Sequence, residues 1–582
     1  MKKFLIGLVA GFLLAGLACL ITVFAMLRFS ERQPSIPGQA TLILGLEGQV
    51  PEIAPVEMPF PFLRSRTPLT VYETWDLLRK AAADSRIKAL VFQPRGVGAG
   101  WAKLDQIRSS LLAFKKSGKP VYAFLRNPGM REYYLATAAD RIFLTREDLM
   151  DVKGLRAEVT HYRRGLDKIG VQMEVEYAGK YKDASDAFVR TSMTPETREV
   201  LNAVLDQLYT HLVEVIASSR KRTPEQVRAA LDQGPFLAHE AKRLGLVDEL
   251  LFENQVLDEM KKRLGQGELK KVSHRDYAKI PAISLGLEGR TRIALVTGEG
   301  PITRGDGDSL GGDEGIRSAA FSRLLREAGE DSEIKGVIVR VNSPGGDAIA
   351  SDEILHEMRR LSERKPTVIS MSDLAASGGY FISVSGDPIL AHANTFTGSI
   401  GVVYGKLNLS NLYEKLGFNT EILKRGKNAD IDTASAPLSD TGRKKLREGV
   451  DFVYRSFVDR VAEGRRKKAS EIEPLAQGRL WTGAQAHRHG LVDEIGGLDE
   501  ALETLRKKAM IGSEEKLRIV RYPRKRSFLE LLFSESEVSL REAGLRWKMR
   551  AISEKLHLPT AGISQIPLEG MLRIAPYTLR VE

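Results

Sequence analysis

The sequence predicts an α/β fold in which a parallel sheet is built twice along one chain. From about Thr41 onward, strand-like apolar runs alternate with amphipathic helical segments, a pattern typical of strands that pair in parallel. Segments of similar sequence also recur at a separation of 247 residues, as between Ile87 and Ile334 and between Gly170 and Gly417. At 582 residues the chain is too long for one core, so a duplicated domain accounts for its length.

The repeat sets the expected domain boundaries. We expect a membrane anchor over residues 1–32, a first copy over 33–262, a linker over 263–291, a second copy over 292–510 and a basic amphipathic extension over 511–582. The extension mixes basic residues with leucine, phenylalanine and tryptophan, so two interpretations remain open. It lies on a membrane surface, or it packs against the body or another subunit.

The first element is a candidate transmembrane helix. Residues 4–27 contain no charged side chain, and 24 residues at about 1.5 Å each span about 36 Å, enough to cross a bilayer. This run is longer than the apolar core of a cleaved signal peptide, which favours an uncleaved anchor. Lys2 and Lys3 favour a cytoplasmic N-terminus, although Arg28 and Arg32 oppose them. The body of the chain would then lie outside the plasma membrane.

Composition excludes several kinds of site. The 87 lysine and arginine residues against 75 acidic residues give a net charge of +12, which suits anionic lipid about as well as nucleic acid. No recognition-helix, zinc-finger or RNA-binding signature is present, so no nucleic-acid partner is expected. The only cysteine, Cys19, lies in the apolar run, which excludes a disulfide within one chain and a cysteine nucleophile in the body. No metal-ligand spacing is present, and we expect neither a metal nor a cofactor.

A candidate nucleophile lies in the second copy. The stretch MSDLAASGGYFIS places Ser377 among small residues, after an apolar run and before a predicted helix. The positive end of a helix favours an oxyanion there. The equivalent position of the first copy is Met130, so only the second copy carries this serine. The alternative is a tight turn without chemistry.

A candidate base lies in the first copy. Lys182 in AGKYKDASDAF has Ala429 as its equivalent, so one copy has the lysine and the other the serine, as a shared active site would require. A lysine activates a serine only when its amine is neutral, and burial must therefore lower a pKa that is ordinarily near 10.4. Ser399, which faces Val152 in the repeat, could hold this amine. The alternative for Lys182 is drift on a surface loop.

Glycines beside the serine are candidates for an oxyanion hole. Gly345 and Gly346 in SPGG and Gly378 after the serine offer backbone N–H groups that no side chain obstructs. The alternative is a pair of glycine turns at strand ends. A Ser-His-Asp triad is less favoured, because no histidine of the second copy has a suitable context: His356, His392, His487 and His489.

These motifs resemble a known family. VNSPGG, AASGGYFIS, TGSIGV and GKYKDASDAF, in a tandem-repeat chain with an N-terminal anchor, resemble the long bacterial signal peptide peptidase A, or protease IV. The resemblance implies two Clp-protease/crotonase-like domains of stacked ββα units and a Ser/Lys dyad. Ser377 would be the nucleophile, Lys182 the general base, Ser399 the group that assists the lysine, and Gly345 part of the oxyanion loop. Asp373 departs from the family, which is often glycine-rich there.

The resemblance also implies a biological setting. It predicts a serine endopeptidase anchored by a single pass in the bacterial inner membrane, with its catalytic body on the periplasmic side. It would assemble as a homotetramer and degrade signal peptides left after secretion, through an acyl-enzyme. Two alternatives remain: a noncatalytic or acyl-CoA-handling member of the same superfamily, and a membrane scaffold.

Overall fold

The computed structural model describes residue 11 and residues 34–54, 68–306, 315–524 and 571–574. The predicted anchor over residues 1–32 lies outside this part apart from Gly11. Within the described part, none of the helices combines the length and the apolar character needed to cross a bilayer.

The first half of the chain forms a six-stranded parallel sheet in the order β8-β4-β3-β2-β1-β9. Its strands are β1 (Ala40–Gln49), β2 (Ile87–Gly98), β3 (Val121–Leu125), β4 (Arg141–Leu144), β8 (Glu249–Leu250) and β9 (Lys271–Ser273). Its helices are α2 (Val71–Ala83), α3 (Trp101–Lys116), α4 (Met130–Ala136), α5 (Arg163–Ile169), α6 (Asp186–Val189), α7 (Pro195–Arg220), α8 (Pro224–Leu231), α9 (Ala238–Arg243), α10 (Glu253–Arg263) and α11 (His274–Ala278). A small pair, β5 (Leu149–Met150) and β7 (Phe236–Leu237), and a 3₁₀ turn, η1 (Ala282–Leu285), complete this half.

The second half repeats this sheet. The strands β20-β16-β15-β13-β10-β21 pair in the same parallel order, and β17 and β19 extend the sheet from β15. The strands are β10 (Thr291–Glu299), β13 (Ile334–Ser343), β15 (Thr367–Ala376), β16 (Ile389–Ala391), β17 (Phe396–Gly398), β19 (Leu480–Thr482), β20 (Glu494–Ile495) and β21 (Leu517–Tyr522). The helices are α12 (Ser318–Glu330), α13 (Ala348–Arg364), α14 (Gly378–Ser383), α15 (Ser410–Lys415), α16 (Asp440–Arg465), α17 (Ala469–Ile472), the 3₁₀ turn η2 (Glu473–Leu475), α18 (Gly483–Arg488) and α19 (Leu498–Lys508).

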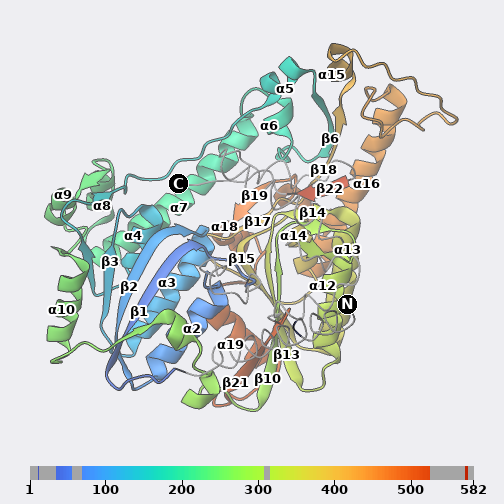
Figure 1. Ribbon diagram of the computed structural model, residues 1–582. Helices are drawn as coiled ribbons and strands as arrows, with labels where there is room; N and C mark the ends of the chain where they lie inside the picture. The colour runs from blue at the N-terminus through green and yellow to red at the C-terminus, as the bar shows by residue number, and fades with distance from the viewer. Residues whose placement is uncertain (1–10, 12–33, 55–67, 307–314, 525–570, 575–582) are drawn as a thin grey trace, which may run out of the picture.

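Helices cover the sheets, so the side chains of these strands are buried. Runs of apolar residues in the sequence therefore form the strands. Leu90, Val91 and Phe92 in β2 are fully buried, as expected for a parallel strand with both faces covered. Figure 1 shows the blue strands of the first sheet on one side and the yellow-green and red strands of the second on the other. The mixed α/β architecture expected from the alternating pattern is therefore present in both halves. Strand β9 lies in the stretch expected to be a linker, and β21 lies in the stretch expected to be the extension.

A third sheet joins the two halves, in the order β12-β11-β14-β22-β18-β6. Its strands are β6 (Gln172–Ala178), β11 (Ile302–Thr303), β12 (Ile316–Arg317), β14 (Gly345–Asp347), β18 (Val402–Asn408) and β22 (Met571–Ile574). Strand β6 of the first half pairs antiparallel with β18 of the second over the full length of both, and the two strands lie side by side in Figure 1. The loop that follows β6 is thereby held against the second half. That loop contains Lys182.

Candidate active site

Ser377 lies at the corner between strand β15 and helix α14. Its side chain is fully buried, and its backbone has φ 54° and ψ −117°, a conformation that a residue with a Cβ rarely adopts. Its N–H donates to the carbonyl of Gly398 at 2.8 Å, which fixes the corner. A Cβ on Gly379 would lie 2.6 Å from the carbonyl oxygen of Ser343. The small residues of this stretch are thus needed because the neighbouring backbone comes close.

Lys182 reaches Ser377 from the other half of the same chain. Its Nζ lies 2.9 Å from Ser377 Oγ, 3.0 Å from Ser399 Oγ and 3.2 Å from the Ser399 carbonyl oxygen. Only 1% of Lys182 is exposed, so this amine has been removed from bulk water. The two residues that distinguish the repeats are therefore within hydrogen-bonding distance.

A backbone loop of the second half holds the lysine, and the sequence did not reveal it. The N–H of Tyr181 donates to the Gln477 carbonyl at 2.8 Å, and the N–H of Gly478 donates to the Ile400 carbonyl at 2.7 Å. A Cβ on Gly478 would lie 2.6 Å from the Cβ of Lys182. This contact uses backbone atoms and the absence of a side chain. The only sequence signal is one glycine among 52.

Ser399 is strained in the same way as Ser377. It has φ 50°, and its N–H donates to the Arg479 carbonyl at 2.7 Å. Its side chain is fully buried. Two serines with positive φ thus flank the buried amine, and strain of this kind concentrates at functional sites.

The glycines predicted for an oxyanion hole lie together beside the serine. A Cβ on Gly378 would lie 3.1 Å from both the Gly345 Cα and the Gly346 N. The Gly345 N–H donates to Ser343 Oγ at 3.1 Å. A Cβ on Gly346 would overlap the Ile302 carbonyl oxygen, so this position admits no side chain. The glycine loop and the start of α14 are consequently in backbone contact.

None of the histidines of the second half is a hydrogen-bond partner of Ser377 among the described residues. Among the described residues, the hydrogen bonds of Ser377 involve Lys182, Gly398 and Phe381, and none involves a histidine. Burial lowers the pKa of His392 to about 4, so this imidazole is neutral over the usual pH range. In the same described part, no three His, Cys, Asp or Glu side chains are grouped as ligands for a metal ion.

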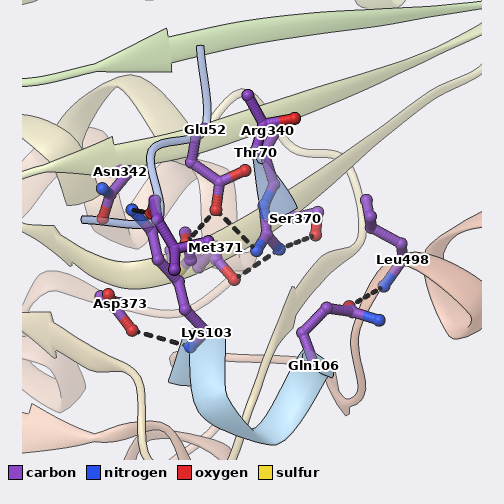
Figure 2. Close-up of polar contacts among 12 residues, drawn as sticks. Glu52, Thr70, Lys103, Gln106, Arg340, Asn342, Ser370, Met371, Asp373 and Leu498 are labelled. Carbon is purple, nitrogen blue, oxygen red and sulfur yellow. Dashed lines mark hydrogen bonds and ion pairs between the residues drawn. The ribbon is translucent and has the colours of Figure 1, made fainter. Parts of the chain in front are cut away.

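A buried polar cluster includes Asp373 of β15, the strand that leads to Ser377 (Figure 2). We call it the inter-half cluster, and its charged members are Glu52, Lys103, Glu299, Arg340 and Asp373. Arg340 forms an ion pair with Glu52 at 3.0 Å, and Lys103 forms one with Glu299 at 3.0 Å. Both pairs join the first half to the second.

Charges within this cluster stabilise one another. Burial alone would raise the pKa of Glu52, but the charges of Arg340 and Lys103 outweigh it and hold that pKa below its usual value. Burial likewise opposes the charged form of Lys103, but the carboxylates of Asp373, Glu52 and Glu299 outweigh it and raise the pKa of Lys103. Compensation holds for Glu52 and Lys103, whereas burial raises the pKa of Asp373 above its usual value despite the charge of Lys103.

Asp373 explains one departure from the resemblance. Its carboxylate accepts hydrogen bonds from the N–H groups of Gly100 at 2.9 Å and Lys103 at 2.8 Å. Gly100 is the N-cap of α3 and has no side chain to cap that helix, so Asp373 caps it from the other half. Asp373 lies in β15, four positions before Ser377, and thereby ties the strand of the serine to the half that carries the lysine.

Comparison with known proteins identifies the family. The sequence pattern of Peptidase family S49 matches residues 113–267 and 359–512. The chain belongs to peptidase family S49. The two matches fall in the two halves, and each copy of the S49 domain contributes to the site: Lys182 lies in the first match, and Ser377 and Ser399 lie in the second.

Sequence similarity to relatives in this family extends over about three quarters of the chain. The chain is 35% identical over 76% of its length to "Serine protease SPPA, chloroplastic" of Arabidopsis thaliana, of which the match covers 66%. It is 31% identical to "Protease 4" of Haemophilus influenzae over 75% of this chain and 72% of that protein. "Protease 4" of Salmonella typhi is also 31% identical, over 74% of this chain and 71% of its own length. Family and names together support a serine protease of the S49 family.

One solved structure is also similar to this chain, but the similarity is weaker. A ClpP1 point mutant from Listeria monocytogenes is 14% identical and matches 36% of this chain and 94% of its own, with a TM-score of 0.24. A score this low carries no argument about the fold.

Proposed function

We propose that this S49 protein is a serine endopeptidase in which Ser377 is the nucleophile and Lys182 the general base. The observation that carries the proposal is the 2.9 Å contact between Lys182 Nζ and Ser377 Oγ in a buried site made by two halves of one chain. A serine beside a desolvated amine is an established arrangement for nucleophilic catalysis.

The reaction follows from the donors and acceptors around the amine. A neutral lysine has two N–H donors and one lone pair. The Oγ and the carbonyl oxygen of Ser399 accept the two donors, which aims the lone pair at the Ser377 hydroxyl. Lys182 then takes the hydroxyl proton while Ser377 Oγ bonds to the peptide carbonyl carbon.

The tetrahedral intermediate needs donors for its oxyanion. The N–H groups of Gly378 and Gly346 are the candidates, because the N–H of Gly345 already bonds to Ser343. Collapse of the intermediate breaks the C–N bond, and Lys182 gives its proton to the departing amine. Water, deprotonated by the same lysine, then hydrolyses the acyl ester and restores Ser377.

Extended apolar peptides, including cleaved signal peptides, are the proposed substrates. The resemblance to signal peptide peptidase A favours them, and so does the apolar segment over residues 4–27, which would tether the protein where such peptides remain. In this proposal residues 1–32 anchor the chain in the bacterial inner membrane, with the catalytic body on the periplasmic side.

A homotetramer is the proposed assembly, and the repeat suggests its interface. Within the chain β6 pairs with β18. The repeat equivalents of these strands, residues 419–425 and 155–161, belong to no strand among the described residues, although Ala157 forms an isolated β-bridge. Leu423 is 94% exposed there, and burial of this apolar side chain would favour association with another chain. We propose that 419–425 of one subunit pairs with 155–161 of the next.

Cysteine cross-linking tests this interface. Glu176 pairs with Tyr404 within the chain, so the repeat places Leu423 opposite Ala157 of the neighbouring subunit. Oxidation of the Cys19→Ser, Ala157→Cys, Leu423→Cys variant is expected to give a ladder that ends at four chains, and each single-cysteine variant is the control. Absence of cross-links between chains would overturn the proposed interface.

Labelling with a fluorophosphonate, followed by peptide mapping, tests the catalytic proposal. The label is expected on Ser377 of the wild-type chain and is expected to disappear in Lys182→Ala. A label on another residue would reject the assignment. Absence of any label, together with absence of peptide cleavage, would favour the noncatalytic or acyl-CoA-handling alternative.

A further inference from the structure

Arg479 contacts two aromatic rings, one from each half of the chain. The central carbon of its guanidinium group (Cζ) lies 4.8 Å from the centre of the Tyr181 ring and 4.6 Å from the centre of the Trp481 ring. The face of an aromatic ring attracts a cation at this distance. Tyr181 directly precedes Lys182 in the chain, so Arg479 links the segment of the proposed base to strand β19 of the second half.

A carboxylate of the first half contacts the same guanidinium group. Arg479 Nη1 lies 2.5 Å from Glu199 Oε1, and the Tyr181 hydroxyl donates to Glu199 Oε2 at 3.2 Å. The hydrogen bond from Arg479 holds the pKa of Glu199 below its usual value. Because 53% of the Glu199 side chain is exposed, this ion pair alone stabilises little. Contact with the buried Trp481 ring and the half-buried Tyr181 ring is better shielded from water.

The backbone around Arg479 also contacts the groups that surround the lysine amine. The Arg479 carbonyl accepts the N–H of Ser399 at 2.7 Å, and Ser399 Oγ lies 3.0 Å from Lys182 Nζ. The carbonyl of Gln477, two residues earlier, accepts the N–H of Tyr181 at 2.8 Å. Side chain and backbone of this segment therefore hold the lysine from both sides.

Comparison of the two copies singles out the same contact. The N-caps of the equivalent helices α9 and α18 each lie three residues after the position in question, which makes Gly234 the equivalent of Arg479. Tyr181 has Asn428 as its equivalent at the separation of 247 residues. Both partners thus differ between the copies, as Ser377 does, which favours a role in the site over a role in the shared scaffold.

We propose that Arg479 is a positioning residue for the proposed reaction, and that it keeps Lys182 within reach of Ser377 through its contact with Tyr181. The inference rests on the proposed function, because it takes Lys182 as the base. Lys182 Nζ lies 2.9 Å from Ser377 Oγ, so a displacement of about 1 Å would take it beyond hydrogen-bonding distance.

Steady-state kinetics on a fluorogenic peptide separate positioning from peptide binding. Arg479→Ala is expected to lower kcat about ten-fold and to leave KM unchanged. Arg220→Ala is the matched control, since Arg220 also has a largely buried side chain and an ion pair, with Asp248 at 2.8 Å. It is expected to keep kcat. Unchanged kcat in Arg479→Ala, an equal loss in both variants, or a change in KM alone would overturn the proposal.

A double-mutant cycle tests whether Arg479 acts through the Tyr181 ring. Tyr181→Leu removes the ring and is expected to lower kcat about ten-fold, whereas Tyr181→Phe keeps the ring and is expected to keep kcat. The Arg479→Ala, Tyr181→Leu chain is then expected to lose about ten-fold in total, because both changes remove one contact. A loss of about a hundred-fold, the product of independent effects, would reject this route. If Arg479→Ala does not fold, equal kcat values in Tyr181→Leu and Tyr181→Phe would overturn the proposal.

Fluorophosphonate labelling distinguishes failure of this inference from failure of the proposed function. Ser377 is expected to be labelled in both chains, about ten-fold more slowly in Arg479→Ala than in the wild-type chain. Equal labelling rates at Ser377 would overturn the role of Arg479 and leave the dyad in place. Absence of a label on Ser377 in the wild-type chain would overturn the proposed function, and the positioning role with it.

Discussion

The two halves share a scaffold but not a site. In the first, Arg220 forms an ion pair with Asp248 at 2.8 Å, and in the second Arg465 forms the same pair with Asp493 at 2.5 Å. The buried tyrosines of α4 and α14 likewise donate to equivalent carbonyl oxygens, each at 2.9 Å. Duplication therefore preserved the contacts that hold each domain together.

Backbone strain shows where the halves diverged. Lys221 and Arg466 both adopt a left-handed conformation at the ends of α7 and α16, a shared device that ends a long helix. Ser377 and Ser399 have positive φ in the second half only. At the position equivalent to Ser377, Met130 starts a helix after an extended glycine. The two serines with positive φ therefore lie in the second half, whereas the first half contributes Lys182.

The largest expected effect comes from the residues that differ between the halves. Replacing Ser377 or Lys182 with alanine is expected to lower kcat/KM for a fluorogenic peptide by about 10⁴-fold or more, since either change removes the proposed dyad. Lys180, which is exposed and retained as Lys427 in the second half, is the control, and Lys180→Ala is expected to keep its activity. Equal losses in all three variants would contradict the assignment.

A smaller effect is expected at the loop that holds the lysine. Gly478→Ala places a methyl group against Lys182 and is expected to lower kcat by about 10- to 100-fold, because misplaced catalytic groups are costly. Gly490→Ala is a matched control. Its φ of 71° is close to the 75° of Gly478, but its Cβ would meet only the flexible end of Lys467. Equal losses in both variants would show that strain, rather than contact with the lysine, is responsible.

The second half has a buried titrating group that the first lacks. The pKa of His392 is lowered by burial from its ordinary 6.5 to about 4, and its equivalent in the first half is Thr145. Between pH 6.5 and about pH 4, His392 binds a proton in the unfolded chain but not in the folded chain. The free energy of unfolding therefore falls as the pH falls through this range. Lowering the pH from 7.5 to 5 should cost about 2 kcal/mol through this group.

Urea unfolding at the two pH values measures this loss. His392→Gln is expected to remove the His392 share of the pH dependence, whereas His356→Gln, at an exposed position, is expected to keep it. An unchanged pH dependence in His392→Gln would contradict the origin proposed for it.

The smallest expected effect concerns the contact between the halves. Asp373→Ala removes the cap of α3 and should lower stability by about 1 kcal/mol, and Ser439→Ala removes the cap of α16 with a similar cost. Only Asp373→Ala is expected to lower kcat as well, since Asp373 ties β15 to the half that carries Lys182. Activity lost equally in both variants would mean that Asp373 acts through stability alone.

The candidate-site residues that could be predicted from the sequence are those recognised by their side chains. Subtracting one copy from the other singled out Ser377 and Lys182 because each is a change of side chain at a matched position. The loop at Gly478, the cap formed by Asp373 and the pairing of β22 were missed. These depend on backbone atoms, on contacts between distant segments and on strand register, which leave little trace in local composition.

The shared site of two halves is tested most directly by complementation. Two differently tagged chains, one with Ser377→Ala and one with Lys182→Ala, are produced together, and co-purification through both tags isolates the mixed assemblies. Because Lys182 and Ser377 meet within one chain, these assemblies are expected to show no more peptide cleavage or fluorophosphonate labelling than either variant alone. Recovery of cleavage with a label on Ser377 would show that the lysine comes from another chain and would contradict the account.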